Sequence, residues 1–560
     1  MRNTSCRPGL AFLLVCLLAS VSLGLADERS DKVDKLFSEW DKPDSPGFAM
    51  AVLEDGKILY TRGYGSANLE LGVPLSPQSV FYIASTSKQF TAACVALLAK
   101  QGKLSLDDNI RKYVPEIPDY GTPITIRNLL HHTSGLRDYL TLEMIAGKSF
   151  GEYHKADVLE LLSRQKELNF APGTEFLYSN SGYFLLAVIA ERAGGKSFRE
   201  LTRELIFEPL GMENSHFHDD YQMLIKNRAS GYFPASEKGK FANYISTFDC
   251  VGDGGLYTSV EDLFHWDQNF YTHQVGGPDL VAQIQTPGVL KNGEKLDYAF
   301  GLMIGTYKGL RTVMHGGALE GYRTEMIRFP DERFSVICLS NFSEANPAKL
   351  CHEIAQIYLA GKLKEDKTTA PKPGGKPAFL QLPEGKLKDV AGMYFQPAEE
   401  SIVNISFGDG KLWVEFMGRR FPLGAVSESE FRVLDAPVEA GLKFEKPMAG
   451  KPMIMNMVME GQKDVRYEKI EPAKPTPAEL QEFAGDYRSE ELDTTFRLAV
   501  KEGKLFFVHK NAVPNALQPT LPDKFAAGPF ALRFVRENEK KITGFALNAG
   551  RVKNLSFVKK

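Results

Sequence analysis

A serine and a lysine stand three residues apart in the stretch Phe81-Tyr82-Ile83-Ala84-Ser85-Thr86-Ser87-Lys88, directly after a short apolar run. On a helix, residues with this spacing share a face, so the lysine amine can reach the serine hydroxyl. A serine is a weak nucleophile until a neighbouring base takes its proton, and an amine held in an apolar site can be that base. The pair Ser85 and Lys88 is therefore a candidate nucleophile with its base.

The same spacing occurs three times in the chain, so it needs support from elsewhere. Ser163 and Lys166 lie in a polar helical stretch, which predicts a solvated face. Ser556 and Lys559 lie in a terminal strand, where residues three apart point to opposite faces. Only the pair at Ser85 has helper motifs in the rest of the sequence.

Two such motifs each occur once: Tyr178-Ser179-Asn180 and His315-Gly316-Gly317. Taken alone, the first is most often a helix cap and the second holds an ordinary histidine. However, Tyr178 follows a turn and precedes an apolar helical stretch, which places it on a loop that a rigid element positions. A serine nucleophile needs such groups for proton transfer, for the developing oxyanion and for substrate placement.

The bulk composition is that of a globular protein: 560 residues, 43% apolar, 24% charged and a formal net charge of −3. The length predicts two to four domains, and the charge gives no reason to expect nucleic acid or an anionic membrane as partner. Arg2 and Arg7 precede an apolar run over residues 10–19, and small residues end at Ala26. We expect residues 1–26 to be a signal peptide of an exported, periplasmic or secreted protein. A membrane anchor is the alternative, for which the run is short, and no later segment is long and apolar enough to span a bilayer.

Residues 27–362 alternate between strand-like and helix-like stretches. A hairpin is expected over residues 48–60, two further strands over 324–339 and a closing helix over 347–359. This order predicts an α+β domain in which both ends of the segment supply an antiparallel sheet and the helices are inserted between them. Residues 363–379, rich in Lys, Pro, Thr and Gly, read as a linker.

The remainder of the chain repeats itself. Val390-Ala391-Gly392-Met393-Tyr394 recurs as Phe483-Ala484-Gly485-Asp486-Tyr487, and Gly410-Lys411-Leu412 recurs as Gly503-Lys504-Leu505, each 93 residues later. A constant offset over two separate blocks indicates a duplicated unit. We expect two antiparallel β-barrels, over residues 380–470 and 471–560.

Together these motifs resemble the serine β-lactamase and penicillin-binding-protein superfamily, over most of residues 40–360. The closest branch holds class C β-lactamases, D,D-carboxypeptidases, D-aminopeptidases and related esterases. Beyond the serine and lysine, four stretches carry the resemblance: 126–136, 173–183, 207–212 and 254–259. The resemblance implies an antiparallel sheet flanked by helices plus an all-helical lobe, with the serine between them.

The resemblance also implies a role for each site residue. Ser85 would be acylated, Lys88 would accept its proton, and Tyr178 would serve the leaving group and later activate water. Asn180 would hold a substrate amide, and His315, Gly316 and Gly317 would line the substrate. The oxyanion would be bound by the backbone N–H groups of Ser85 and Ala318. No cofactor and no metal are implied.

One departure concerns the substrate. Where many relatives carry Lys-Thr-Gly to bind a free carboxylate, this chain has His315-Gly316-Gly317. Histidine is mostly neutral near pH 7, so we expect a weaker carboxylate anchor and a small peptide or ester substrate, possibly derived from the cell wall, in place of penicillins. Aminopeptidases of this superfamily also carry two β-barrels after the catalytic domain, which matches the duplicated tail.

Alternatives remain open: a true β-lactamase, or a binding or scaffold protein that keeps the fold without turnover. The neighbouring His131 and His132 point apart and have no acidic or cysteine partner at ligand spacing, which disfavours a metal site. Asp249 and Asp253 lie in a loop that either edges the active site or belongs to the plain surface. The four cysteines outside the leader show no paired spacing and are expected in the core more than in disulfides; the sequence leaves the oligomeric state open.

Overall fold

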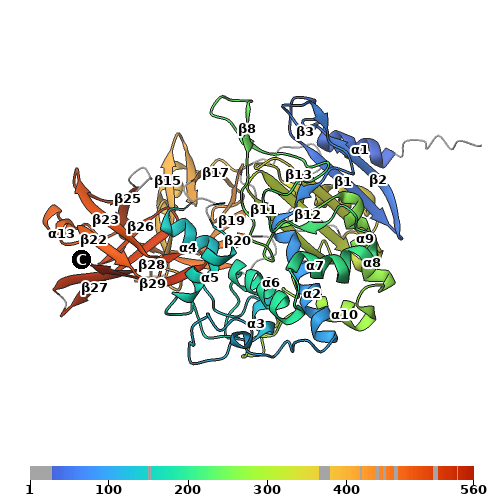
Figure 1. Cartoon of the computed structure of the whole chain (residues 1–560). Helices are drawn as coiled ribbons and strands as arrows, with labels where there is room; N and C mark the ends of the chain where they lie inside the picture. The colour runs from blue at the N-terminus through green and yellow to red at the C-terminus, as the bar shows by residue number, and fades with distance from the viewer. Residues whose placement is uncertain are drawn as a thin grey trace, which may run out of the picture.

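The computed structural model describes residues 28–148, 151, 153–364, 379–416, 419–435, 440–445, 450–459, 464–508, 515–538 and 540–560. The proposed signal peptide and most of the proposed linker lie outside these ranges. Within them, no helix combines the length and the apolar character that crossing a membrane requires. The chain forms a mixed helix and sheet half and two β-barrels, which confirms the predicted fold class (Figure 1).

The first half is organised around a six-stranded antiparallel sheet in the order β10-β11-β12-β13-β1-β2. The run Phe48–Leu53 is buried along its whole length because β1 lies between β13 and β2 and is covered on both faces. Strands from both ends of the segment thus pair as predicted. The strands are β1 Phe48–Glu54, β2 Lys57–Tyr64, β10 Met303–Tyr307, β11 Leu310–Leu319, β12 Tyr322–Phe329 and β13 Phe334–Ser340.

Alternate residues of the sheet enter two separate cores. Met50 and Val52 pack with α1 Glu28–Phe37 and α11 Pro347–Tyr358 on one face. Ala49 and Ala51 belong to the larger core on the other face, which also contains α2, α6 and α9. The two-residue period of a strand therefore divides one apolar run between two layers.

The helical lobe packs around α2 Lys88–Lys100 and α6 Asn180–Gly194, which contact each other directly. Both are apolar on nearly all sides, as expected for helices in the centre of a domain. The other helices of this half are α3 Ile126–Leu130, α4 Tyr139–Ala146, α5 Lys155–Ser163, α7 Phe198–Thr202, α8 Glu208–Leu210, α9 Val260–Thr272 and α10 Gly277–Ile284. Short strands β3 Ser66–Asn68, β4 Val73–Pro74, β5 Phe81–Tyr82, β6 His216–Phe217, β7 Gly231–Pro234, β8 Phe241–Tyr244 and β9 Leu256–Thr258 complete it.

The second half consists of two closed eight-stranded barrels. The first has strands β14 Gly392–Gln396, β15 Ser401–Gly408, β16 Lys411–Phe416, β17 Arg419–Ala425, β18 Glu430–Val433, β19 Ala440–Phe444, β20 Ile454–Met459 and β21 Val465–Ile470, after helix α12 Glu384–Val390. The second has β22 Gly485–Ser489, β23 Thr494–Lys501, β24 Lys504–Val508, β25 Asn515–Pro519, β26 Lys524–Ala527, β27 Phe530–Glu537, β28 Lys541–Ala549 and β29 Val552–Lys559, after helix α13 Pro477–Glu482.

The sequence repeat has an exact structural counterpart in each barrel. The Tyr394 hydroxyl donates to the carbonyl of Val390 over 2.8 Å, and the Tyr487 hydroxyl donates to that of Phe483 over 2.9 Å. Each tyrosine thereby fastens the leading helix to the first strand and buries its ring in the barrel. The 93-residue offset therefore preserves a packing device as well as a sequence.

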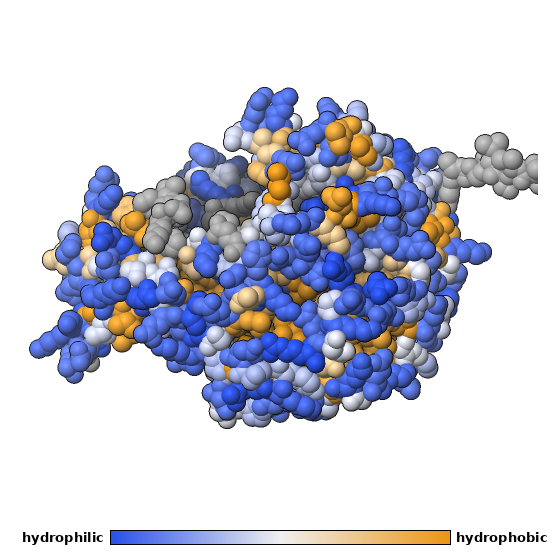
Figure 2. Space-filling view, viewed as in Figure 1, coloured by the Kyte–Doolittle hydropathy of each residue, from blue (hydrophilic) through white to orange (hydrophobic). Residues whose placement is uncertain are grey.

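The barrels lie to one side of the first half, and β28 and β29 reach toward α4 and α5 (Figure 1). Buried residues of the second barrel form one continuous core cluster with those of the first half. Hydrophilic residues cover most of the face seen in Figure 2, and the apolar residues on it occur in separate small groups.

Candidate active site

The backbone before Ser85 adopts an unusual conformation. Ala84 has a φ of +45°, in the left-handed region that residues with a Cβ rarely occupy. Such a residue costs about 1–3 kcal/mol and persists only where its surroundings enforce it. Here the N–H of Ile83 donates to the carbonyl of Leu256, and a 3₁₀ turn, η1 Ala84–Ser87, follows. The α-helix begins only at Lys88, so Ser85 lies in the 3₁₀ turn before it and not in the regular helix on which the three-residue spacing was interpreted. Its side chain is partly exposed.

Lys88 is fully buried and donates three hydrogen bonds from Nζ. The acceptors are Ser85 Oγ at 3.0 Å, Asn180 Oδ1 at 2.9 Å and the backbone carbonyl of Asp253 at 2.5 Å. Burial lowers the pKa of Lys88 to about 7, although the negative charge of Asp253 acts in the opposite direction. The amine is thus aimed at the serine hydroxyl, and both its neutral and its protonated form are present near pH 7.

Asn180 is the first residue of α6, and both its backbone and its side chain form hydrogen bonds. Its backbone N–H donates to Asp138 Oδ2 over 2.7 Å, while its side-chain oxygen accepts from Lys88. Asp138 also caps α4, because Oδ1 accepts from the backbone and the hydroxyl of Thr141. One buried carboxylate therefore fixes the starts of two helices and, through them, the position of Asn180.

Tyr178 lies beside this group, with the Lys88 ammonium 4.9 Å from its ring centroid. Its hydroxyl is buried and forms no hydrogen bond of ordinary geometry with the described residues. Burial raises the pKa of Tyr178, and the proximity of Ser85 offsets this effect in part. The ring packs on His132, whose centroid is 4.2 Å away and whose Nδ1 accepts from the N–H of Ser179 over 3.1 Å. Tyr178 is therefore held as a neutral phenol facing the nucleophile.

His315 is buried on β11 and is held at both ring nitrogens. Nδ1 lies 2.6 Å from the Gly316 carbonyl, which can only accept, so Nδ1 carries the proton. Nε2 then accepts from the Tyr298 hydroxyl at 3.1 Å. Burial, helped by the charge of Lys88, lowers the pKa of His315 to about 4, so the imidazole is neutral near pH 7.

The two glycines after His315 lie where no side chain fits. A Cβ on Gly317 would come within 2.2 Å of the Ile83 carbonyl oxygen, and one on Gly316 within 2.6 Å of Glu325 Oε2. The hydroxyl of Thr86 also donates to the His315 carbonyl over 3.3 Å. The glycines thus bring the strand segment that contains Ala318 directly against the turn that contains Ser85.

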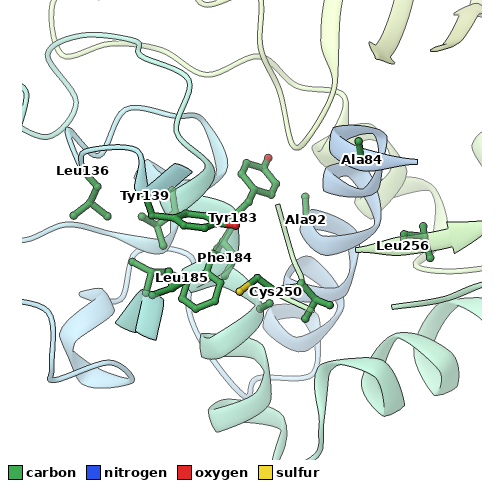
Figure 3. Packing of buried hydrophobic residues seen from close by; sticks show 14 of the residues in the cluster. Ala84, Ala92, Leu136, Tyr139, Tyr183, Phe184, Leu185, Cys250 and Leu256 are labelled. Carbon is green, nitrogen blue, oxygen red and sulfur yellow. The ribbon is translucent and has the colours of Figure 1, made fainter. Parts of the chain in front are cut away.

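A dense apolar core supports the site from below. Tyr139, Tyr183, Phe184 and Cys250 pack together next to α2 (Figure 3). The Tyr139 hydroxyl donates to Asp253 Oδ2 over 3.0 Å, which ties the loop that bonds Lys88 to α4. Rotation of the candidate site residues is resisted because their neighbours are close-packed.

All the site residues that the sequence singled out lie in this region, and four more join them. Asp138, Asp253 and Tyr298 were missed or left open, and Arg551 of the second barrel was not anticipated. Of the two aspartates in the 249–253 loop, Asp253 enters the site, whereas Asp249 pairs with the exposed His154. The one feature of the sequence that could have pointed to Asp138 as a site residue is its position before a helix. No residue near Arg551 in the sequence indicates that it belongs to the site.

The remaining candidates have structural partners. His131 Nδ1 lies 3.3 Å from the Tyr298 carbonyl and His132 bonds the Ser179 amide, so both are part of the packing around the site. Within the ranges described, no three His, Cys, Asp or Glu side chains gather in a way that would hold a metal ion. The four described cysteines are buried and free.

The chain matches a known protein family over most of its first half. The model of the family described as Beta-lactamase matches residues 33–357, more than half of the chain. The chain belongs to the beta-lactamase family. This confirms the resemblance that the motifs carried.

The relatives of this beta-lactamase family member include a penicillin-binding protein and several D-aminopeptidases. Penicillin-binding protein 4* of Bacillus subtilis (strain 168) is 35% identical over 305 residues, which cover 52% of this chain and 67% of that protein. The D-aminopeptidase of Gluconobacter oxydans (strain 621H) is 33% identical over 303 residues, covering 54% of this chain and 56% of that protein. The match thus spans little more than half of the aminopeptidase.

Solved structures show the same fold. The octameric penicillin-binding protein homologue from Pyrococcus abyssi superposes with a TM-score of 0.55 at 24% identity, over 78% of this chain and 99% of that one. The D-amino acid amidase from Ochrobactrum anthropi SV3, in complex with L-phenylalanine amide, gives 0.51 at 20% identity, over 60% of this chain and 99% of that one.

Proposed function

We propose that this member of the beta-lactamase family is an exported serine hydrolase that cleaves an amide or ester through an acyl-enzyme. The observation that carries the proposal is the contact between Lys88 Nζ and Ser85 Oγ, 3.0 Å apart, with the pKa of the amine lowered to about 7. A buried amine at this distance, with its neutral form well populated near pH 7, is a competent general base.

The proposed acylation begins when neutral Lys88 takes the proton of Ser85. The Oγ then forms a bond to the substrate carbonyl carbon, and the carbonyl oxygen becomes an oxyanion that accepts from the N–H groups of Ser85 and Ala318. As the tetrahedral intermediate collapses, the bond to the leaving group breaks. That group receives a proton from Tyr178, which is replenished from Lys88.

Deacylation repeats these steps with water as the nucleophile. Tyr178 takes the water proton as its own phenolic proton passes to Lys88, and the water oxygen bonds to the acyl carbon. The bond between that carbon and Ser85 Oγ then breaks as Lys88 returns the proton to Oγ, and the carboxylic acid leaves. Because the phenol pKa is raised by burial while the lysine pKa is lowered, Lys88 serves as the resting base and Tyr178 as a relay. Asn180, held between Lys88 and Asp138, would present its amide to the substrate.

For the substrate, we propose a small peptide or ester, in the manner of a D-aminopeptidase, D,D-peptidase or esterase. Relatives named D-aminopeptidase support this class, as does the neutral state of His315, which supplies no cation for a penicillin carboxylate. The leader-like residues 1–26 support export, which the N-terminal residue of the mature protein tests directly.

A serine-directed fluorophosphonate combined with intact-mass analysis tests the core of the proposal. We expect one adduct on the full chain, its loss in Ser85→Ala, and its retention in Ser163→Ala, which removes the half-buried serine of a second Ser-x-x-Lys. D- and L-aminoacyl p-nitroanilides, p-nitrophenyl esters and nitrocefin then distinguish peptidase, esterase and β-lactamase. Absence of any adduct, together with binding of the full chain to peptidoglycan, would instead favour a non-catalytic scaffold.

A further inference from the structure

Arg551, a cation of the second barrel, lies next to Tyr178, although the two residues are far apart in the sequence. Arg551 occupies the turn between β28 and β29, and its Cζ lies 4.6 Å from the ring centroid of Tyr178. The Lys88 ammonium lies 4.9 Å from the same centroid. The site proposed for acyl transfer is therefore completed by a group that the catalytic half does not encode.

The turn is held in place by its backbone. The Arg551 carbonyl accepts from the Asp138 N–H at 3.3 Å and from Asn169 Nδ2 at 2.9 Å, and the Lys553 N–H donates to Asn169 Oδ1 over 2.8 Å. Arg137 donates to the Lys553 carbonyl over 3.1 Å. These contacts do not use the Arg551 side chain, so substitutions there leave the docking of the turn intact.

Buried charge reinforces the same attachment. The fully buried guanidinium of Arg137 pairs with Glu491, which lies between β22 and β23 of the same barrel. Glu491 also accepts from the Lys166 N–H over 2.7 Å. A buried pair with several hydrogen bonds fixes geometry more strictly than an exposed one.

The guanidinium of Arg551, in contrast, has unused hydrogen-bonding capacity. Its nearest carboxylate, Asp138, is 4.0 Å away and already accepts three hydrogen bonds from the starts of α4 and α6. Within the described residues Arg551 donates no side-chain hydrogen bond, and its side chain is 43% exposed. Asp253, the other acidic group near Lys88, is buried and bonded to Tyr139.

We propose that Arg551 binds an anionic group of the substrate, a carboxylate a few atoms from the scissile carbonyl. The inference rests on the proposed function, because it assumes that the carbonyl is attacked by Ser85. A guanidinium matches a carboxylate with two parallel hydrogen bonds, and it disfavours a substrate ammonium at the same place. The barrel thus supplies a cation where His315 supplies none. Among the substrate classes proposed above, this favours an acidic D,D-peptidase or esterase substrate over an aminopeptidase substrate with a free amino terminus.

Three p-nitrophenyl esters of equal length test this on the full chain: the mono-glutarate, which is anionic, the neutral valerate and the cationic 4-aminobutyrate. We expect kcat/KM to rank glutarate above valerate above 4-aminobutyrate. A charge-assisted hydrogen bond predicts that Arg551→Met lowers the glutarate-to-valerate ratio by roughly 10- to 100-fold. Arg551→Lys should retain part of the preference, and Arg551→Glu should invert it toward 4-aminobutyrate.

The matched control is Lys553→Met, which removes the same charge two residues further along the hairpin, where Lys553 lies 3.6 Å from Glu175. It should leave the ratios unchanged. If Arg551→Met lowers kcat/KM by the same factor for all three esters, Arg551 only positions Tyr178 and the inference is wrong. Labelling by the fluorophosphonate would still support the proposed function in that case. If the wild-type chain neither labels nor hydrolyses any ester, the proposed function fails and the inference fails with it.

Discussion

Lys88 and Asp253 share one buried environment without a direct ion pair. The lysine Nζ donates to the backbone carbonyl of Asp253 over 2.5 Å, whereas the carboxylate of Asp253 turns to the Tyr139 hydroxyl at 3.0 Å. Burial lowers the pKa of Lys88 and raises that of Asp253, and each charge partly offsets the effect on the other. This arrangement leaves the lysine able to lose its proton near pH 7.

The pH dependence of acylation follows from this pair. Only the neutral amine accepts the Ser85 proton, so kcat/KM should fall about tenfold per pH unit below the Lys88 pKa of about 7. Asp253→Asn removes the negative charge that favours protonated Lys88, so the acid limb should move to lower pH. Asp249→Asn, in the same loop but paired with His154, is the control. An acid limb that stays in place in Asp253→Asn would exclude Lys88 as the titrating base.

Tyr178→Phe separates the hydroxyl from the ring. The ring contacts with His132 remain, and the hydroxyl that is lost makes no hydrogen bond of ordinary geometry to any residue that the structure describes. We expect the thermal midpoint to stay within about 2 °C, while loss of a proton relay lowers kcat by about 100- to 10,000-fold. A drop in thermal stability that parallels the drop in kcat would show that the hydroxyl is structural.

Gly317→Ala tests the close approach of β11 to the nucleophile turn. Its Cβ would meet the Ile83 carbonyl oxygen at 2.2 Å, so the strand must move away from Ser85. Displacement of an oxyanion donor predicts a loss of about 100-fold or more in kcat. Gly305→Ala on the neighbouring β10, where the nearest atom is Thr312 Oγ1 at 3.3 Å, should keep most activity. Equal effects of the two variants would contradict this geometry.

The attachment of the second barrel depends on the buried Arg137–Glu491 pair. Glu491→Gln leaves the Arg137 charge buried without a counter-charge, which predicts a destabilisation of about 3–5 kcal/mol and earlier proteolysis of the barrel. Glu490→Gln breaks only the exposed contact with Lys166, for which about 0–1 kcal/mol is expected. The two thermal unfolding curves, recorded side by side with proteolysis, should therefore differ clearly, and coincident curves would show that the barrel is held by other contacts.

Much of the fold could be predicted because it depends on local patterns. Contiguous residues were enough to predict three features: the hairpin at Asp55-Gly56, the apolar helices α2 and α6, and the 93-residue repeat. The residue at which α2 begins could not be predicted from the sequence, because Ala84 adopts a left-handed conformation that only its surroundings enforce. Asp253 illustrates the same limit within the site, since the sequence could not distinguish it from Asp249 until the loop was folded.

The sequence by itself was enough to propose the central group: Ser85, Lys88, Tyr178 and His315 lie in motifs that are common singly but that together resemble those of one superfamily. The tertiary structure alone decided their protonation, because the pKa of Lys88 depends on complete burial and on the orientation of Asp253. It also decided which distant charge enters the site. Arg551 is one arginine among many in the sequence, and only the docking of the barrel turn on Asp138 and Asn169 brings its side chain to Tyr178.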